Sequence, residues 1–223
     1  MKLIDRILAL VFPPRCAFCG QIMPVDFKGN ICSDCKEHLP LIPAEKQALY
    51  GDFYTLCVSS FFYKEPVIDS IHRYKFQGRS WYSRVYGPYL RATLQEQFPD
   101  GFDLVTWAPL STLRHWKRGY DQAELLAAEA GKLYGIRPLR LLRKTRHTKA
   151  QSKLSPAARR KNAANLYRVV PGVRLKGKRI LLVDDVVTTG STLSDCARAL
   201  VGAGAGEVVC LTLARSVSAR DLP

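Results

Sequence analysis

Apolar residues recur along the chain in two patterns, continuous short runs and helical spacings, and the two patterns alternate. Residues Ile180 to Val183 form a continuous apolar run rich in branched side chains, which is typical of a strand buried on both faces of a parallel sheet. The predicted strands include residues 103–107, 179–184 and 207–213. The predicted helices include residues 67–76, 119–134 and 191–203. This alternation predicts an α/β fold, with a central parallel sheet flanked by helices.

The N-terminal part of the chain is organised differently. Residues Met1 to Phe12 mix apolar and charged positions and predict a short amphipathic helix whose apolar residues face a partner surface. The segment Pro40 to Pro43 is the predicted linker. We therefore expect a small N-terminal domain over residues 1–50 and an α/β domain over residues 51–223.

The hydropathy pattern contains no candidate membrane segment. No stretch approaches the roughly 18 consecutive apolar residues that a membrane span needs. The uncharged run Ile7 to Phe12 is too short for the core of a signal peptide, and no small-residue cleavage site follows it. These features predict a cytoplasmic protein with no membrane span.

Composition narrows the class of partner. The chain has 223 residues, of which 47% are hydrophobic and 24% are charged, which excludes a disordered or fibrous protein. Its formal net charge is +15, and residues 137–179 hold fifteen Lys or Arg side chains and no acid. A surplus of this kind favours a phosphate-rich partner, a small phosphorylated molecule or single-stranded DNA. The competing interpretation is a solvated basic face.

Four of the seven cysteines form two C-x2-C pairs, Cys16 with Cys19 and Cys32 with Cys35. A tight turn at each pair directs two thiolates toward one tetrahedral Zn²⁺, and Gly20 supplies permissive backbone for the first turn. Two disulfides are the alternative, but a cytosol keeps thiols reduced. Four thiolates leave no open coordination position, so we expect a structural zinc. The other three cysteines are expected to be small buried side chains: Cys57, Cys196 and Cys210.

The strongest candidate for chemistry follows the strand at 179–184. Asp184 and Asp185 come at its C-terminal end, where ligands bind in open α/β sheets. The next segment opens a predicted helix whose first amides and dipole attract phosphate. This candidate phosphate loop consists of Thr188, Thr189, Gly190, Ser191 and Thr192. It lacks the lysine and spacing of a Walker loop. Carboxylates beside a phosphate loop are explained economically by a ribose 5-phosphate, whose hydroxyls donate to the acids.

The segment from Val183 to Thr192 resembles the phosphoribosyl pyrophosphate (PRPP) signature of type I phosphoribosyltransferases. This segment, two further parts of the chain and the cysteine pairs together resemble the bacterial ComF/GntX family of competence-associated proteins. The first further part is Ala108 to Ser111, Arg114 and Lys117 to Ala123. The second consists of the positions Arg143, Thr148, Gln151, Leu154, Arg159 and Asn162. The resemblance covers essentially the whole chain and implies a zinc ribbon joined to a type I phosphoribosyltransferase-like domain. It departs at Asp121, where the family more often has Asn.

The resemblance implies a role for each matched residue. Asp184 and Asp185 would be the catalytic pair that binds the ribose hydroxyls, and residues 188–192 would bind the 5-phosphate. Arg114 and Arg118 would face the pyrophosphate, with a solvated helix face as the alternative. Residues 143–162 would form a loop that closes over the substrate. Mg²⁺ would accompany PRPP.

Lys75 is a further candidate for phosphate binding. It lies in the sequence Tyr74 to Arg79, at the end of the predicted helix 67–76. The competing interpretation is an ordinary amphipathic helix that ends at Gly78.

Two functions of different classes follow. The first is a phosphoribosyltransferase that binds PRPP or a related phosphoribosyl ligand and transfers ribose 5-phosphate to an unidentified acceptor, releasing pyrophosphate. The second is a non-catalytic protein of DNA uptake that binds single-stranded DNA through its basic face and contacts proteins of the competence machinery. A PRPP-sensing regulatory protein is a third possibility. Fold alone does not choose among them.

Overall fold

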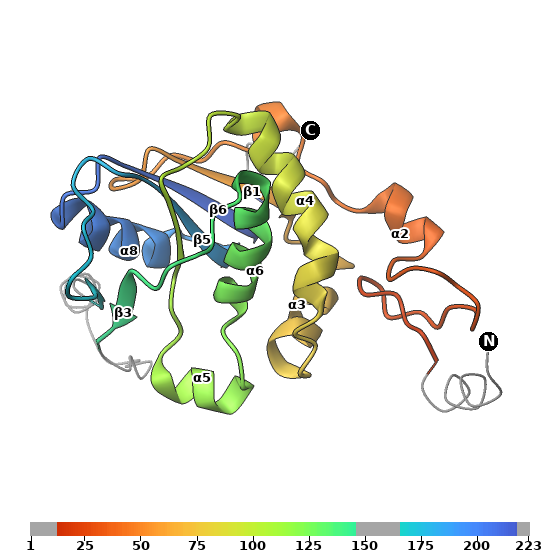
Figure 1. The fold of residues 1–223 in the computed structure, drawn as a ribbon. Helices are drawn as coiled ribbons and strands as arrows, with labels where there is room; N and C mark the ends of the chain where they lie inside the picture. Colours follow the sequence, from red (N-terminus) through yellow and green to blue (C-terminus); the bar gives the residue numbers. More distant parts are fainter. Residues whose placement is uncertain (1–12, 146–165, 218–223) are drawn as a thin grey trace, which may run out of the picture.

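The computed structural model describes residues 13–145 and 166–217, and its centre is a four-stranded parallel sheet (Figure 1). The strand order is β1-β6-β5-β2, and each neighbouring pair is parallel. The strands are β1 (Leu56–Phe62), β2 (Leu104–Trp107), β5 (Arg179–Val187) and β6 (Glu207–Arg215). The parallel sheet and its flanking helices confirm the α/β fold that the sequence predicts.

Alternate residues of the central strand face opposite layers of the molecule. Leu181 and Val183 pack toward the face covered by three helices, whereas Ile180 and Leu182 pack toward the other face. The first layer contains α3 (Val67–Phe76), α4 (Tyr82–Gln97) and α6 (Gln122–Gly131), and the second contains α8 (Ser191–Gly202) (Figure 1). Burial on both faces explains why this strand has no polar alternation.

The predicted helix over residues 119–134 is shorter in the structure, where it spans residues 122–131. A separate helix, α5 (Thr112–Arg118), precedes it and ends at Gly119, whose φ of 77° lies in the left-handed region. The main helix α6 then begins at Gln122, after Asp121 accepts a hydrogen bond as its N-cap, and the 3-10 turn η2 (Lys132–Tyr134) follows it. Glycine ends one helix and aspartate starts the next, which are the usual preferences at these two positions.

A short antiparallel pair stands beside the main sheet. It consists of β3 (Leu142–Lys144) and β4 (Tyr167–Val169). Tyr167 and Leu142 pack with α8 in the second core layer. The connection between the two strands spans residues 146–165, which lie outside the described residues.

The N-terminal part of the molecule is attached to the sheet along the predicted linker. It contains α2 (Ser33–His38) and the 3-10 turn η1 (Ala44–Lys46). Between them, Leu41 forms an antiparallel bridge with Phe61 of β1, and the Ile42 amide donates to the Ser60 carbonyl at 3.0 Å. Backbone pairing therefore holds this segment against the edge strand. The predicted helix Met1 to Phe12 lies outside the described residues.

Two further expectations concern burial and length. The side chains of Cys57, Cys196 and Cys210 are fully buried, as predicted for small core residues. Within the described residues, no helix is both long enough and apolar enough to cross a membrane.

Candidate functional site

The two adjacent acids lie on strand β5 itself. The strand continues to Val187, three residues beyond the predicted end at 184, and Asp184 and Asp185 are both partly buried. The Asp185 amide donates to the Asp184 carboxylate at 2.8 Å, so the backbone fixes one carboxylate relative to the other. Because β5 is a central strand, both acids are held at the carboxyl edge of the sheet.

The Asp184 carboxyl group has a strongly shifted protonation equilibrium. Burial, and next the negative charge of Asp185, raise its pKa to about 8, while the Asp185 amide and Lys75 oppose the rise. At neutral pH the free protein therefore holds a mostly protonated Asp184 beside Asp185. Removing one negative charge lets two carboxyl groups share this edge at low energetic cost.

Lys75 reaches the acid pair from α3. Its Nζ lies 2.8 Å from Oδ1 of Asp185, and the exposed fractions of the two side chains are 19% and 14%. The pair joins residues 110 positions apart, which no local pattern reveals. Arg79, at the other end of the same sequence segment, is exposed.

Arg118 lies near the same acid, whereas Arg114 is exposed one turn earlier on α5. The Arg118 guanidinium stacks over the Phe76 ring at 4.8 Å and donates to Oε1 of Gln122 at 2.7 Å. Burial lowers its pKa, and the nearby Asp185 carboxylate opposes that shift. The pKa of Lys144 on β3 is lowered first by its own burial and then by the charge of Arg114. The structure thus brings Arg118 close to Asp185, whereas Arg114 remains exposed on the same helix.

The candidate phosphate loop joins β5 to α8. Gly190 is the residue before the helix, and its φ of 72° is one that glycine adopts without strain. Gly190 has no side chain to cap α8, so within residues 13–145 and 166–217 the amides of its first turn have no capping acceptor. The four hydroxyl residues around Gly190 are exposed: Thr188, Thr189, Ser191 and Thr192. The phenol of Tyr54 packs beneath the loop, 3.0 Å from the position that a Cβ on Gly190 would take.

Asp121 fixes the loop after β2, a role that sequence reasoning missed. Its carboxylate accepts from the Leu110 amide at 2.9 Å and from the Ala123 amide at 3.1 Å, and the residue is 5% exposed. Burial raises the pKa of this carboxyl, and the backbone amides of Leu110, Glu124 and Ala123 oppose the rise. The loop and the start of α6 are therefore held by one side chain.

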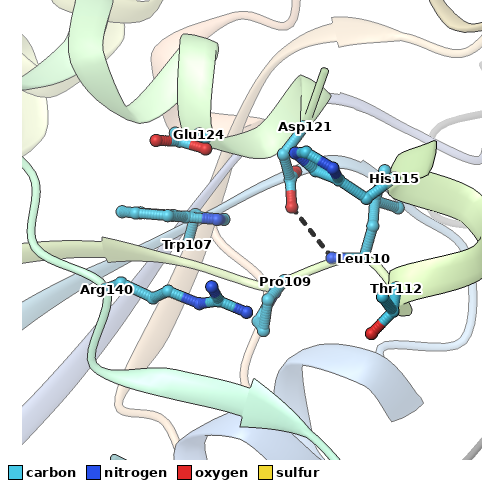
Figure 2. Close-up of a pocket in the computed structure, with 8 residues that line it drawn as sticks. All are labelled: Trp107, Pro109, Leu110, Thr112, His115, Asp121, Glu124 and Arg140. Carbon is cyan, nitrogen blue, oxygen red and sulfur yellow. Dashed lines mark hydrogen bonds between the residues drawn. The ribbon is translucent and has the colours of Figure 1, made fainter. Parts of the chain in front are cut away.

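This loop lines part of a cavity of about 250 Å³ (Figure 2). Figure 2 shows Asp121 and Glu124 on the side of α6, His115 from α5, and Arg140 across the ring of Trp107. Burial and then Asp121 raise the pKa of Glu124, while His115 and Arg140 lower it. His115 lies on α5, whereas its charged neighbours come from the start of α6 and from the segment before β3, so no local spacing connects them.

The four N-terminal cysteines form one cluster. Their sulfur atoms all lie within 4.8 Å of one another, and the Sγ atoms of Cys19 and Cys32 are 3.8 Å apart. Two sulfurs bound tetrahedrally at about 2.3 Å from one ion are separated by about 3.8 Å. Burial favours the neutral Cys16 thiol, but the amides of Cys32, Cys19 and Phe18 together lower its pKa to about 7. The donor set fits a structural zinc, and all seven cysteines are free of disulfides.

Part of the predicted closing loop is outside the described residues. Arg143 lies on β3, but the remaining positions of the resemblance are not described: Thr148, Gln151, Leu154, Arg159 and Asn162.

Comparison with family models matches both parts of the chain. Residues 7–47 match the model described as a double zinc ribbon domain, and residues 123–223 match the model described as a phosphoribosyl transferase domain. The first match coincides with the cysteine cluster. The second contains the acid pair and the phosphate loop.

Comparison with curated proteins gives relatives over most of the chain. Competence protein F of Haemophilus influenzae is 31% identical over 212 residues, which cover 91% of this chain and 85% of the relative. The DNA utilization protein YhgH of Escherichia coli K12 is 31% identical, over 88% of this chain and 82% of the relative. Competence protein ComFC of Streptococcus pneumoniae is 28% identical, over 90% of this chain and 100% of the relative.

Solved structures match the chain more loosely. One is titled as the structure of the allosteric regulatory enzyme of purine biosynthesis. It is 26% identical with a TM-score of 0.40, over 57% of this chain and 25% of that chain. The family models and the curated relatives therefore carry the assignment.

Proposed function

The chain belongs to the family of competence protein F and the DNA utilization protein YhgH, and from this premise we propose that it is a PRPP-binding phosphoribosyltransferase. In this proposal it transfers ribose 5-phosphate from PRPP to an acceptor and releases pyrophosphate. The observation that carries the proposal is the acid pair on β5 beside the uncapped start of α8. The carboxyl groups that would bind the ribose hydroxyls are then separated by one loop from the amides that would bind the phosphate. This arrangement matches the two ends of a ribose 5-phosphate.

Each residue of the site has a defined task in this proposal. Asp184 and Asp185 accept hydrogen bonds from the ribose hydroxyls. The amides at the start of α8 and the side chains of residues 188–192 hold the 5-phosphate. Lys75 and Arg118, which already face Asp185, receive the negative charge of the pyrophosphate. Arg114, exposed on the same helix as Arg118, meets the same group.

The acid pair also fits Mg²⁺ as a partner of PRPP. This ion takes oxygen ligands and is usually held by one or two carboxylates together with substrate phosphates. Asp184 and Asp185 are consecutive carboxyl groups near the end of β5, and either could serve as such a ligand. When bound, the ion neutralises charge on the pyrophosphate oxygens.

The reaction is a substitution at C1 of the ribose. The bond from C1 to the pyrophosphate oxygen breaks, and its electron pair leaves with the pyrophosphate. The lone pair of an acceptor nitrogen forms the new bond to C1, and the proton of that nitrogen passes to solvent. Positive charge develops on the ribose in the transition state, so a fixed carboxylate near the ring stabilises it.

Calorimetry tests the proposal. The zinc-loaded protein is titrated with PRPP and Mg²⁺ beside the double variant Asp184→Asn/Asp185→Asn. We expect saturable binding by the wild type and its loss in the variant, after which candidate acceptors are screened for pyrophosphate release. A folded wild type that takes up no PRPP would sink the proposal.

The second candidate function is binding of single-stranded DNA. It is favoured by the basic surplus of residues 137–179 and by relatives named for competence and DNA utilization. Part of that surplus is already paired, because Lys178 contacts Asp103 at 2.9 Å and Arg179 contacts Glu207 at 2.7 Å. Binding of a labelled oligonucleotide that weakens steeply with salt would support this function.

Three further expectations accompany the proposal. We propose that the protein acts in the cytoplasm and that its N-terminal part contacts proteins of the competence machinery. We also propose residues 1–50 as the zinc ribbon and residues 51–223 as the phosphoribosyltransferase-like domain. The bridge between Leu41 and Phe61 joins these two parts.

A further inference from the structure

Helix α3 makes polar contacts in two directions at once. Ser70 and Arg73 bind backbone of the cysteine-rich segment, whereas Tyr74 and Lys75 bind groups around the acid pair. Figure 1 shows α3 between the N-terminal loops and the α5–α6 side of the molecule. One short helix thus contacts both the zinc centre and the proposed ligand site.

The contacts toward the zinc centre converge on its first turn. Ser70 Oγ donates to the Ala17 carbonyl at 2.6 Å, and Arg73 Nη2 donates to the Phe18 carbonyl at 2.5 Å. The Arg73 guanidinium also packs on Gly20, 3.5 Å from where a Cβ would stand. Ala17 and Phe18 are the two residues between Cys16 and Cys19, so α3 binds the backbone that the metal holds.

The same turn is inserted into the core of the α/β part. Ala17 and Phe18 are fully buried. The Phe18 ring packs edge-on against Phe61 at 5.5 Å, Tyr86 at 5.8 Å and Tyr89 at 6.1 Å. A cysteine turn seated this deeply transmits its geometry to the elements around it, because close-packed interiors have little room to absorb a shift.

The contacts toward the ligand site fix the last turn of α3. The buried Tyr74 donates its phenol proton to the Gln122 carbonyl at 2.9 Å, and the Tyr120 hydroxyl donates to the Tyr74 carbonyl. Lys75, the next residue, contacts Asp185 at 2.8 Å. The rotation of α3 about its axis therefore decides whether Lys75 meets the acid pair.

Helix α3 has little stability of its own. It has ten residues, and its N-cap Pro66 makes no side-chain hydrogen bond. Isolated helices shorter than about 12–15 residues are marginal in water. The position of Lys75 consequently depends on tertiary contacts, and Ser70 and Arg73 supply those on one side.

We propose that the zinc-held turn positions the ligand site through α3. Ser70 and Arg73 are positioning residues that hold α3 against the turn, and α3 in turn presents Lys75 to Asp185. Zinc binding and PRPP binding are then energetically coupled. The dependence of α3 on the zinc-held turn, which is the structural half of the inference, does not require the proposed function. Only the identity of the ligand as PRPP rests on that function.

Coupling between two sites is reciprocal. If zinc strengthens PRPP binding by some factor, then PRPP strengthens zinc binding by the same factor, and typical coupling factors are about 5 to 150. We expect Mg²⁺-PRPP to tighten zinc binding at least about fivefold. Competition with a zinc chelator, with and without saturating Mg²⁺-PRPP, measures this ratio.

Hydrogen exchange tests the structural half without any ligand. Zinc is removed by a chelator, and amide exchange is followed across the full chain. We expect faster exchange in α3 up to Phe76 and in residues 120–122, with β5 and β6 still protected. Faster exchange confined to residues 14–39 would overturn the inference.

A matched pair of variants tests the proposed route. Arg73→Ala removes the guanidinium that binds the Phe18 carbonyl, whereas Arg84→Ala removes an exposed guanidinium on α4. With zinc bound, we expect faster exchange in α3 for Arg73→Ala only. We also expect its zinc affinity to become nearly independent of PRPP, with partial recovery in Arg73→Lys. Equal behaviour of Arg73→Ala and Arg84→Ala would overturn the inference.

These readouts separate this inference from the proposed function. If the wild type binds no PRPP, the proposed function fails, and exchange in α3 still decides the inference. If PRPP binds but neither α3 exchange nor zinc affinity responds, the inference fails and the function stands. If removal of zinc unfolds β5 and β6 as well, amide exchange in α3 of the zinc-bound Arg73→Ala protein decides whether the inference holds.

Discussion

At the scale of single residues, the acid pair is shaped by groups that lie far away in the sequence. Asp184 carries a pKa of about 8 because it is buried beside Asp185, and Lys75 arrives from α3 to compensate the second acid. The sequence identifies all three residues as candidates. Their protonation and pairing arise only from the packing of α3 against the end of β5.

Asp184→Asn should stabilise the protein while it removes PRPP binding. In the wild type, the folded carboxyl stays protonated up to about pH 8, whereas the unfolded carboxyl ionises near pH 4. The unfolded state therefore binds fewer protons between these values, and the free energy of unfolding falls as pH rises. The neutral amide avoids this loss, so the gain should grow from pH 5 to pH 8. It should reach at least about 1 kcal/mol, or roughly 2–4 °C in Tm.

Thermal unfolding at several pH values measures this effect, with the exposed Asp100→Asn as control. A stability gain that does not depend on pH would contradict the assigned protonation of Asp184.

Lys75→Ala should weaken both the fold and the binding of PRPP. Removal of the amine leaves Asp185 unpaired beside a second carboxyl group. Loss of a partly buried hydrogen bond to a charged group costs about 1–3 kcal/mol. Denaturant unfolding and PRPP calorimetry measure the two effects, with the exposed Arg79→Ala as the matched variant from the same segment. Similar losses for both variants would argue against a specific role for Lys75.

At the scale of elements, two helix starts organise the site. The start of α8 is left open by Gly190, whereas the start of α6 is capped by Asp121, which also holds the Leu110 amide. An open start leaves donors for an anion, and a capped start ties a loop to its helix. The loop before α8 is thus open to an anion, whereas the loop after β2 is tied to α6.

Gly190→Ala should disturb the phosphate loop more than its backbone strain alone explains. A Cβ here would meet the Tyr54 hydroxyl at 3.0 Å, and the φ of 72° costs about 1–2 kcal/mol for a side chain. Gly172→Ala is a close control, because its φ is 83° and nothing lies within 4 Å. We expect both variants to lose stability and only Gly190→Ala to lose PRPP affinity, as calorimetry would measure.

Asp121→Asn should loosen the loop after β2. The carboxylate accepts one amide proton on each oxygen, and an amide side chain retains only one of these acceptors. We expect a loss of about 1 kcal/mol in the free energy of unfolding, the usual scale for an N-cap. Denaturant unfolding beside the exposed Glu96→Gln measures it. An unchanged midpoint would show that the second hydrogen bond is dispensable.

At the scale of the whole molecule, the zinc centre and the α/β part share one core. Phe18 packs against β1 and α4, and the segment 40–43 pairs with the edge of β1. The cysteine cluster therefore adds to the stability of the sheet layer that carries the proposed site.

The zinc-loaded protein should unfold in a single transition. Phe18→Ala should lower the stability of the whole molecule, because truncation of a buried phenylalanine costs about 3–5 kcal/mol. Ile22→Ala, which removes a side chain that is 55% exposed in the same segment, should have little effect. Calorimetric unfolding checks both, and a separate early transition for the N-terminal part would contradict a shared core.

The sequence by itself determined the local features of this protein. The branched run at 180–183 predicts a buried strand, the cysteine spacing predicts one zinc cluster, and the segment 183–192 predicts acids beside a phosphate loop. Each of these signals is contained within a few dozen residues, where backbone preference and spacing leave few alternatives. Element boundaries follow less closely from the sequence, since β5 continues three residues beyond its predicted end and the helix predicted from residue 119 begins only at Gln122.

Only the tertiary structure decided which distant groups meet. The pairing of Lys75 with Asp185, the hold of Asp121 on Leu110, and the seating of Phe18 in the core each join separate elements. Side-chain contacts of this kind depend on how helices rotate and pack on the sheet, which local spacing does not encode. The raised pKa of Asp184 has the same origin, because burial and neighbouring charge are properties of the folded surroundings.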